Sequence, residues 1–253
     1  MRLIFVRHGD PDYQIDSLTE TGWKEAELVA ERIKKIDEVF GGIREIYVSS
    51  LGRAKDTASC SLKLLQREDE FVCEWMKEFP VQIKRPDVNG ERKIAWDWLP
   101  ADWTKIPAFY DAEQWKQEKI MKEAGVGEEY DRVCREFDKV LEKNGYVRAG
   151  EEEGYFYHAK EANNDVLVFF CHFGVECVFL SHLIHCSPML LWHNFCAVPT
   201  GVTTVITEER RKGIASFRIN QFGDISHLYA GGRAPSFAAR FRECYENDWE
   251  RRD

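Results

Sequence analysis

Leu3-Ile4-Phe5-Val6-Arg7-His8-Gly9 is the stretch that decides the fold of this chain. Its four apolar residues, mostly β-branched or aromatic, predict a buried strand, and Gly9 allows the backbone to turn sharply afterwards. A cation and an imidazole then stand together at the carboxyl end of a core strand, where open α/β sheets hold their ligands. Taken alone, the triplet fits two interpretations equally well. Arg7 and His8 could form a functional site, or they could simply point into solvent at the end of a strand.

A second strand and helix repeat this arrangement. Ile46-Tyr47-Val48 predicts a short buried strand, and Arg53 follows in the first turn of a helix that runs to about Leu65. The start of a helix offers free N–H groups and a positive dipole end, and an arginine adds a forked donor that matches phosphate. Taken singly, an arginine in a helix is more often a surface residue.

The most apolar run of the chain provides a third unit. Asp165 to Cys171 predicts a central parallel strand, and His172-Phe173-Gly174 follows before a helix that reaches about His185. In a sheet with helical crossovers the carboxyl ends of parallel strands share one edge. We therefore expect the two arginines and two histidines to converge in a cationic pocket of the kind that a phosphoryl group requires.

The remaining patterns complete an α/β fold, expected as a three-layer α/β/α sandwich with a mostly parallel central sheet. Thr19 is a good N-cap for a helix over residues 20–36, and Phe71 to Phe79 predicts a third strand ending near Glu78. Further expected elements are a helix from Glu128 to Asn144, a short helix over 188–192, a hairpin of 202–207 with 214–219, and a polar, partly helical tail from about Pro235.

An irregular segment interrupts this order. Five of the eight tryptophans and four prolines lie between residues 75 and 125. We expect an insertion at about 79–127 that caps the site within one domain spanning residues 1–253. Its tryptophans could form a binding box for a hydrophobic partner, although such residues more often pack an insertion onto its core.

Composition narrows the class of protein. The chain has 253 residues, 44% hydrophobic and 31% charged, with a net charge of −9. This balance argues against nucleic acid or an anionic membrane surface as a partner. The eight cysteines are scattered, and we expect them to be reduced in a cytoplasmic protein that has no leader and no membrane span.

Several motifs in order resemble the histidine phosphatase superfamily, also called phosphoglycerate mutase-like. They cover about the 160 residues of the core. The motifs are Arg7-His8-Gly9, Leu18-Thr19-Glu20-Thr21-Gly22, Ser49-Ser50-Leu51-Gly52-Arg53-Ala54-Lys55-Asp56-Thr57-Ala58, Val168-Phe169-Phe170-Cys171-His172-Phe173-Gly174 and Gly223-Asp224-Ile225-Ser226-His227-Leu228.

The resemblance implies a phosphatase, a phosphoric monoester hydrolase, that works through a covalent phosphohistidine on His8. Arg7, Arg53 and His172 would bind the phosphoryl group. Glu78 matches the position of the family's proton donor best, with Glu74 as the runner-up. The resemblance implies no metal and no cofactor, and a small phosphorylated metabolite as substrate. It leaves a homodimer open.

The chain also departs from the pattern. Gln14, beside Tyr13, stands where many relatives carry asparagine, and we place Tyr13, Gln14 and Phe173 with Arg7 and Arg53 among the substrate-binding residues. The alternatives are a phosphoglycerate-type phosphomutase, whose carboxylate-gripping residues are not evident here, and a catalytically idle relative that acts as a binding module. His182 and His185 could suggest a metal, but an ordinary helix face explains them better.

Overall fold

The central feature of the computed structural model is an eight-stranded sheet in the order β5-β4-β10-β1-β11-β12-β9-β8. The structure describes residues 1–150, 152–236 and 241–247. The strands are β1 (Arg2–Arg7), β4 (Ile43–Ser49), β5 (Glu70–Cys73), β8 (Tyr146–Arg148), β9 (Tyr157–Ala159), β10 (Val166–Cys171), β11 (Val202–Arg211) and β12 (Ile214–Asp224). Two small ribbons pair β2 (Pro11–Asp12) with β3 (Ser17–Leu18) and β6 (Gln82–Lys84) with β7 (Arg92–Ile94).

The sheet has a parallel half and an antiparallel half. Strands β5, β4, β10 and β1 run parallel to one another, whereas β11, β12, β9 and β8 continue from β1 in antiparallel order. The predicted α/β class is confirmed, but the prediction of a mostly parallel sheet was wrong. The expected hairpin is present, and it joins the sheet beside β1, where its tight connection forces antiparallel pairing.

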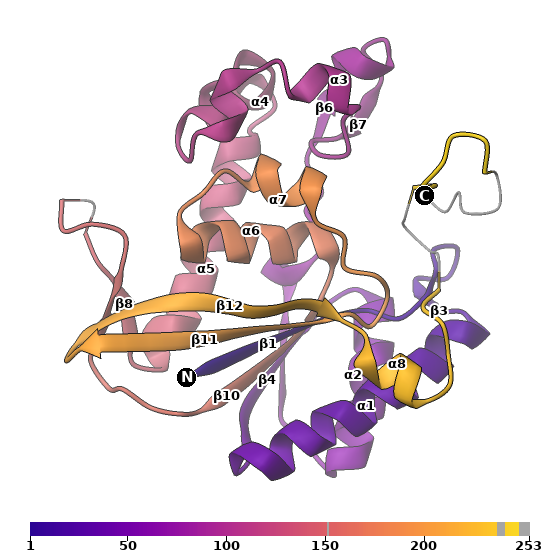
Figure 1. Cartoon of the computed structure of the whole chain (residues 1–253), viewed down its shortest axis with the longest axis vertical. Coiled ribbons are helices and arrows are strands. Elements are labelled where there is room, and N and C mark those ends of the chain that lie inside the picture. The colour runs from indigo at the N-terminus through magenta and orange to yellow at the C-terminus, as the bar shows by residue number, and fades with distance from the viewer. Residues whose placement is uncertain (151, 237–240, 248–253) are drawn as a thin grey trace.

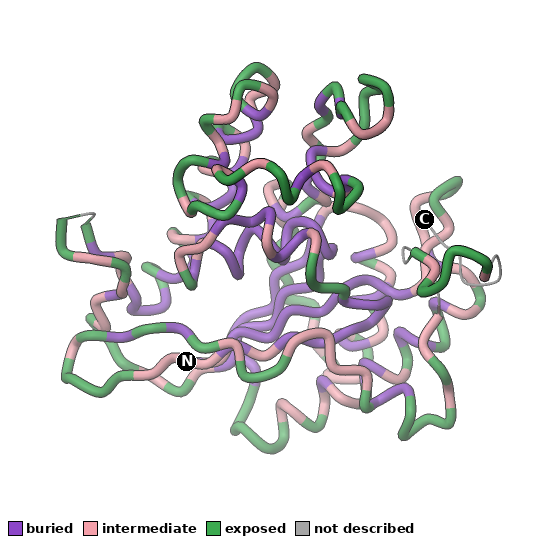
Figure 2. The backbone as a smooth tube through the Cα atoms, turned by 45° about the horizontal axis from the view of Figure 1, so that its top comes forward, coloured by how far each residue is buried: buried purple, intermediate pink, exposed green. Residues whose placement is uncertain are grey.

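Helices cover both faces of the sheet (Figure 1). On one face lie α1 (Glu20–Phe40) and α2 (Gly52–Leu65), and on the other lie α5 (Val126–Lys143) and α6 (Phe173–Ile184). The alternation of β1 explains both layers, because Ile4 and Val6 belong to one core cluster and Leu3 and Phe5 to the other. Figure 2 shows buried backbone concentrated in the sheet and in the helix that crosses above it.

The helix boundaries follow from their caps. The Thr19 hydroxyl accepts a hydrogen bond from the N–H of Gly22 at 3.0 Å, and α1 ends where Gly41 takes a left-handed φ of 80°. Thus α1 extends four residues beyond the expected end at 36. The expected short helix is α7 (Pro188–Asn194). One helix was not predicted from the sequence. It is α8 (Ser226–Ala230), which begins within the motif that runs from Gly223 to Leu228.

Two expectations for irregular regions need correction. Strand β5 ends at Cys73, and the 3₁₀ turn η1 (Glu74–Met76) buries Met76, so Glu78 does not lie at a strand end. Strand β5 is a short and exposed edge strand, and η1 begins where the apolar pattern weakens. Of the tail, residues 237–240 and 248–253 lie outside the described residues, and residues 241–247 form turns rather than helix.

Residues 79–127, the segment predicted to be an insertion, pack over α6 and α7 (Figure 1). Besides β6 and β7 it forms the helices and 3₁₀ turns η2 (Pro86–Val88), α3 (Pro100–Trp103), η3 (Pro107–Tyr110), η4 (Gln114–Gln117) and α4 (Lys119–Glu123). Trp98, Trp103 and Trp115 are buried in the same hydrophobic cluster as Phe5 of the sheet. The tryptophans therefore pack this segment onto the core rather than forming an exposed surface.

Membrane insertion through a helix finds no support in the part of the chain that is described. Its helices are either too short or too polar to cross a bilayer.

Candidate active site

His8 lies just past the end of β1 and is 2% exposed. Its Nδ1 is 2.8 Å from the carbonyl oxygen of Gly9, and a carbonyl only accepts, so Nδ1 carries the proton. The other nitrogen, Nε2, then has its lone pair free to accept the Nε–H of Arg53 at 3.3 Å. Burial first, and then the charges of Arg7 and Arg53, hold the pKa of His8 well below its usual range. The imidazole is therefore neutral at physiological pH, the form that can act as a nucleophile.

Arg53 lies in the first turn of α2 and reaches across to His8. Its guanidinium also donates to Asp16 Oδ1 at 2.6 Å, while Asp16 Oδ2 accepts the N–H of Gly52 at 2.7 Å. Partial burial alone would raise the pKa of Asp16, but these hydrogen bonds, from Gly52 first and then Arg53, lower it. Asp16 thus fixes the guanidinium beside the imidazole in the free protein.

His172 and Arg7 complete the cluster around His8. The parallel pairing of Arg7 with Cys171 brings the two strand ends level, and the rings of His8 and His172 lie 5.0 Å apart. The Nε2 of His172 is 2.8 Å from the hydroxyl oxygen of Ser49. Among the described residues, neither His172 Nδ1 nor Arg7 Nε has a hydrogen-bond partner, although both are buried. An anion bound at this edge could satisfy both nitrogens.

Burial, followed by the charges of His8, Arg53 and Arg7, lowers the pKa of His172 well below its usual range. Arg7 itself is 4% exposed and donates to the carbonyl of Ala197. The expected convergence of Arg7, His8, Arg53 and His172 is therefore present in the structure. Their position at one sheet edge follows from strand register, as the sequence indicated.

The two candidate acids differ sharply in their surroundings. Glu78 Oε1 accepts the N–H groups of Phe79 at 2.8 Å and Val175 at 3.1 Å, which places it at the start of α6, beside His172. Burial raises the pKa of Glu78. Glu74, in contrast, is exposed and paired with Lys77, which lowers its pKa. A proton donor must hold its proton, so the geometry favours Glu78 over Glu74.

The three remaining candidates are less uniform. Tyr13 is 62% exposed, and the Arg53 guanidinium lies 5.3 Å from its ring centroid. Gln14 is exposed, and its backbone N–H bonds Asp12 Oδ1 at 3.0 Å. Phe173 is buried and its ring meets that of Trp96 edge-on at 5.9 Å. Only Tyr13 of these three contacts a member of the cationic cluster directly.

Sequence reasoning missed several supporting residues. Thr57, one helical turn after Arg53, accepts the N–H of Gly9 at 2.9 Å and donates to the carbonyl of Arg53 at 2.7 Å. Asp16 and Ser49 were also passed over, although each contacts a candidate. The i, i+4 spacing of Arg53 and Thr57 was a usable signal, whereas nothing in the loop around Asp16 revealed its role.

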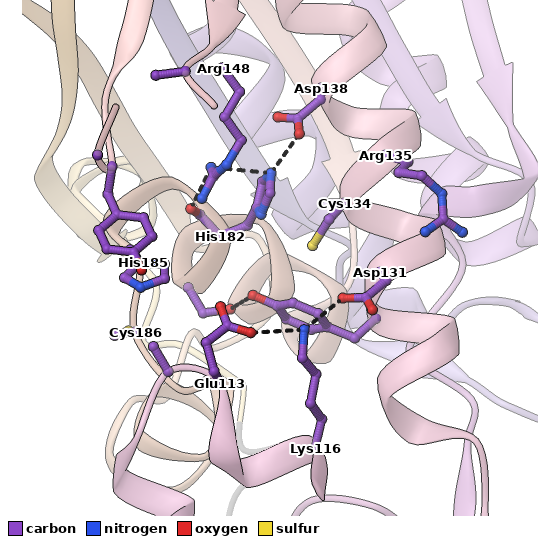
Figure 3. A pocket seen from close by; sticks show the side chains of 16 residues that line it. Glu113, Lys116, Asp131, Cys134, Arg135, Asp138, Arg148, His182, His185 and Cys186 are labelled. Atoms are coloured by element: carbon purple, nitrogen blue, oxygen red, sulfur yellow. Dashed lines mark hydrogen bonds and ion pairs between the residues drawn. The ribbon is translucent and has the colours of Figure 1, made fainter. Parts of the chain in front are cut away.

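A separate cavity of about 300 Å³ lies between α5, the end of α6 and the inserted segment (Figure 3). His182 Nε2 is 2.9 Å from Asp138 Oδ2 there, while the ring of His185 stacks on Tyr155. These two histidines thus have different partners. Within the described residues, no group of three or more His, Cys, Asp or Glu side chains is arranged to hold a metal ion.

Comparison with known families finds a similarity in the first third of the chain. The family model of the histidine phosphatase superfamily (branch 1) matches residues 3–79, a span that includes Arg7, His8, Arg53 and Glu78. This segment of the chain is therefore similar to that superfamily. The match stops short of His172, which the parallel pairing of β1 with β10 brings next to His8. A search among curated proteins finds no match.

Several solved structures share the fold of this chain. A phosphoserine phosphatase mutant from Entamoeba histolytica, in complex with phosphoserine, has a TM-score of 0.56 at 20% identity, covering 90% of this chain and 98% of that chain. A mycobacterial glucosyl-3-phosphoglycerate phosphatase, solved with VO3, has a TM-score of 0.54 at 17% identity, with coverage of 88% and 99%. At these identities the likeness concerns the fold alone.

Proposed function

We propose that this protein is a phosphatase that hydrolyses phosphomonoesters through a phosphohistidine on His8. The observation that carries the proposal is the hydrogen bond from His8 Nδ1 to the Gly9 carbonyl. That bond leaves Nε2 unprotonated, between Arg53 and the ring of His172. A neutral imidazole with a fixed tautomer in a cationic, buried pocket suits nucleophilic attack on phosphorus.

In the first step the Nε2 lone pair attacks phosphorus, a P–N bond forms and the P–O bond to the leaving group breaks. Arg7, Arg53 and His172 stabilise the negative charge on the equatorial oxygens. The forked guanidinium suits this task better than an ammonium does. The Gly9 carbonyl still accepts the hydrogen bond from Nδ1–H and so stabilises the positive charge that the phosphorylated imidazole acquires.

Glu78 then serves as the proton donor. Its protonated carboxyl gives a proton to the leaving alkoxide, and its carboxylate takes a proton from the water that attacks the phosphohistidine. The P–N bond breaks, inorganic phosphate leaves, and His8 and Glu78 return to their starting forms. The raised pKa of Glu78, caused by burial, supports this assignment.

The substrate class that fits is a small phosphorylated metabolite. Two of the similar solved structures are of the Entamoeba histolytica phosphoserine phosphatase, one in complex with phosphoserine and one in complex with 3-phosphoglyceric acid. We assign to residues 79–127 the role of a cap that selects the leaving group. In support, Trp96 of this segment packs against Phe173, the residue that follows His172.

The proposal is tested by trapping the phosphoenzyme. The wild-type protein is mixed with p-nitrophenyl phosphate or with phosphorylated metabolites, quenched in base and examined by mass spectrometry. We expect one phosphoryl group on His8, stable in base and lost in acid. His8→Ala should abolish both the adduct and turnover, whereas His158→Ala, a histidine on strand β9 paired with Glu153, should retain both.

Turnover without a phosphoenzyme would overturn the mechanism. Interconversion of phosphoglycerates without release of phosphate would instead indicate a phosphomutase. Binding of a phosphorylated ligand with no turnover on any substrate would indicate an idle relative.

A further inference from the structure

The loop after β7 reaches the candidate active site through Trp96. A methyl group added at Gly174 would come 2.6 Å from Glu78 Oε1 and 2.9 Å from Trp96 Cζ2. The carboxyl of Glu78 and the indole of Trp96 therefore press on the same glycine, two residues after His172. The residue that follows Trp96 is Asp97, and burial first, then the charge of Glu78, raise the pKa of its carboxyl.

The backbone of this loop is held rigidly by a buried arginine. Arg85 donates to the carbonyls of Trp96, at 3.0 Å, and of Asp97. Its guanidinium is in turn paired with Asp87 at 2.6 and 3.0 Å, and the side chains of Arg85 and Asp87 are only 7% and 0% exposed. A desolvated, doubly bonded pair of this kind is costly to break, so it fixes the position of the loop.

Asp97 is itself held in an uncommon backbone conformation. Its φ is 66°, in the left-handed region that residues other than glycine rarely adopt. Such conformations persist only where the surroundings over-determine them, and they cluster at ligand clamps and active sites. Here the surroundings are the Arg85 clamp on one side and, on the other, the N–H of Trp98, which donates to His193 Nε2 at 3.0 Å.

The Asp97 carboxylate has no structural partner. No hydrogen bond or ion pair joins it to another side chain or backbone group in the described part of the chain, and the residue is partly buried. Burial raises its pKa to about 6, with smaller effects from the charges of Arg85, Glu78 and Arg7. The carboxylate thus lies within electrostatic reach of the proposed phosphate pocket and is ionised at neutral pH.

We propose that Asp97 binds a protonated amine on the leaving group of the substrate, so that the preferred substrates are phosphate esters of amino alcohols. This inference rests on the proposed phosphatase function. The phosphate end of a substrate is matched by Arg7, Arg53 and His172, and none of these carries a negative charge. Asp97 supplies the opposite charge, and an ionised carboxylate accepts hydrogen bonds but donates none.

A cationic group is favoured over a neutral one for a physical reason. A partly buried carboxylate without a partner bears a desolvation cost, and an ammonium would offset that cost by a charge-assisted hydrogen bond. A neutral alkyl group would desolvate Asp97 further and give nothing in return. Discrimination between matched esters should therefore be large when the site contains Asp97 and small when it does not.

The test compares O-phosphoethanolamine with n-propyl phosphate, which have the same chain length and differ by ammonium against methyl. We expect the wild-type kcat/KM to favour the amine ester at least tenfold. Asp97→Asn and Asp97→Gly should each reduce this ratio at least tenfold. Both replacements suit the left-handed φ, so the loop keeps its conformation. Asp102→Asn, in the neighbouring helix α3, should leave the ratio unchanged.

A wild-type enzyme that turns over both esters without preferring the amine would overturn this inference and leave the phosphatase proposal standing. An amine preference that survives both Asp97 variants would also overturn it. Failure to hydrolyse any phosphate ester, p-nitrophenyl phosphate included, would overturn the proposed function and this inference together.

Discussion

His8 and Asp97 are both held in fixed positions, but by different means. His8 is placed by strand register, because β1 pairs in parallel with β10 and its own N–H donates to the Cys171 carbonyl at 3.1 Å. Asp97 is placed by side chains, chiefly by the guanidinium of Arg85 on its carbonyl. The residues at the carboxyl ends of the strands are thus positioned by the topology of the sheet, whereas the loop of the inserted segment is positioned by a few polar side chains.

This difference has a functional meaning. A pocket built from strand register is the same for every substrate that carries a phosphoryl group, so it suits the common chemistry. A loop fixed by side chains can change residue by residue without disturbing the sheet. Mutations on the two sides should therefore differ in kind: those at the sheet edge affect the chemical step, and those in residues 79–127 affect stability and choice of substrate.

The largest effect is expected at the sheet edge, from Arg53→Lys. Lysine keeps the charge but loses the fork and the Nε–H that donates to His8. We expect kcat/KM for p-nitrophenyl phosphate to fall about 10³-fold, the scale of a lost transition-state donor. Arg67→Lys, near the other end of the same helix and paired with Asp69, is the control and should stay within twofold. A wild-type rate in Arg53→Lys would break the comparison.

A second effect concerns the buried acid Glu176, which is 0% exposed in α6. Burial raises its pKa from 4.5 to about 7, so the folded protein keeps a proton that the unfolded chain releases. The contribution of Glu176 to stability is therefore fully present below about pH 4.5 and is lost as pH rises through about 7. The loss is about 3 kcal/mol, at about 1.4 kcal/mol per pKa unit.

Glu176→Gln should remove this pH dependence. Urea unfolding at pH 5 and pH 8 measures it, with the exposed Glu128→Gln as the control. An unchanged slope of stability with pH in Glu176→Gln would show that the carboxyl is ionised in the folded protein.

A third effect lies where the two regions meet. Glu78→Gln removes the proposed proton donor, so alkyl phosphates with poor leaving groups should slow about 10²-fold. p-Nitrophenyl phosphate, whose leaving group needs no proton, should slow by much less. In the wild type, the rate on alkyl phosphates should fall as pH rises through the raised pKa of Glu78. Glu74→Gln is the matched control, and the same pattern there would move the donor to Glu74.

The smallest effect belongs to the inserted segment. Trp98→Phe keeps an aromatic ring but loses the indole N–H that donates to the Ala95 carbonyl at 3.0 Å. We expect a loss of about 1 kcal/mol in the free energy of unfolding, the usual net value of one hydrogen bond. Hydrolysis of p-nitrophenyl phosphate by the folded variant should stay near the wild-type rate. A large drop in that rate would show that the segment takes part in the chemical step.

The sequence predicted the sheet-edge residues well for a physical reason. Arg7, His8 and His172 directly follow buried strands, and Arg53 opens the helix after one, so hydrophobic pattern alone places them. The antiparallel half of the sheet was harder to predict from the sequence, because a hairpin pattern does not reveal which strand the hairpin joins. Likewise, the chain between Phe71 and Phe79 alternates too weakly to show that β5 ends at Cys73.

Asp16 and Asp97 were beyond the reach of the sequence. Both lie in loops at positive φ, with values of 49° and 66°. Their positions depend on partners distant in the chain or on a buried clamp, as in the ion pair of Asp16 with Arg53. Local pattern carries no information on such contacts, which form only once the core has assembled. Residues of this kind are found from the structure and then tested by substitution.

The ion pair of Arg53 with Asp16 has one more consequence for the proposed reaction. In the free protein the guanidinium already holds a carboxylate, so a substrate must replace an anion that the chain itself supplies. A phosphate dianion carries more charge than a carboxylate and can win this exchange, with His172 and Arg7 adding to its hold. An ordinary organic acid offers only what Asp16 offers, at the added cost of losing its freedom in solution. We therefore expect Asp16 to compete with abundant carboxylates for Arg53 and to keep them out of the pocket.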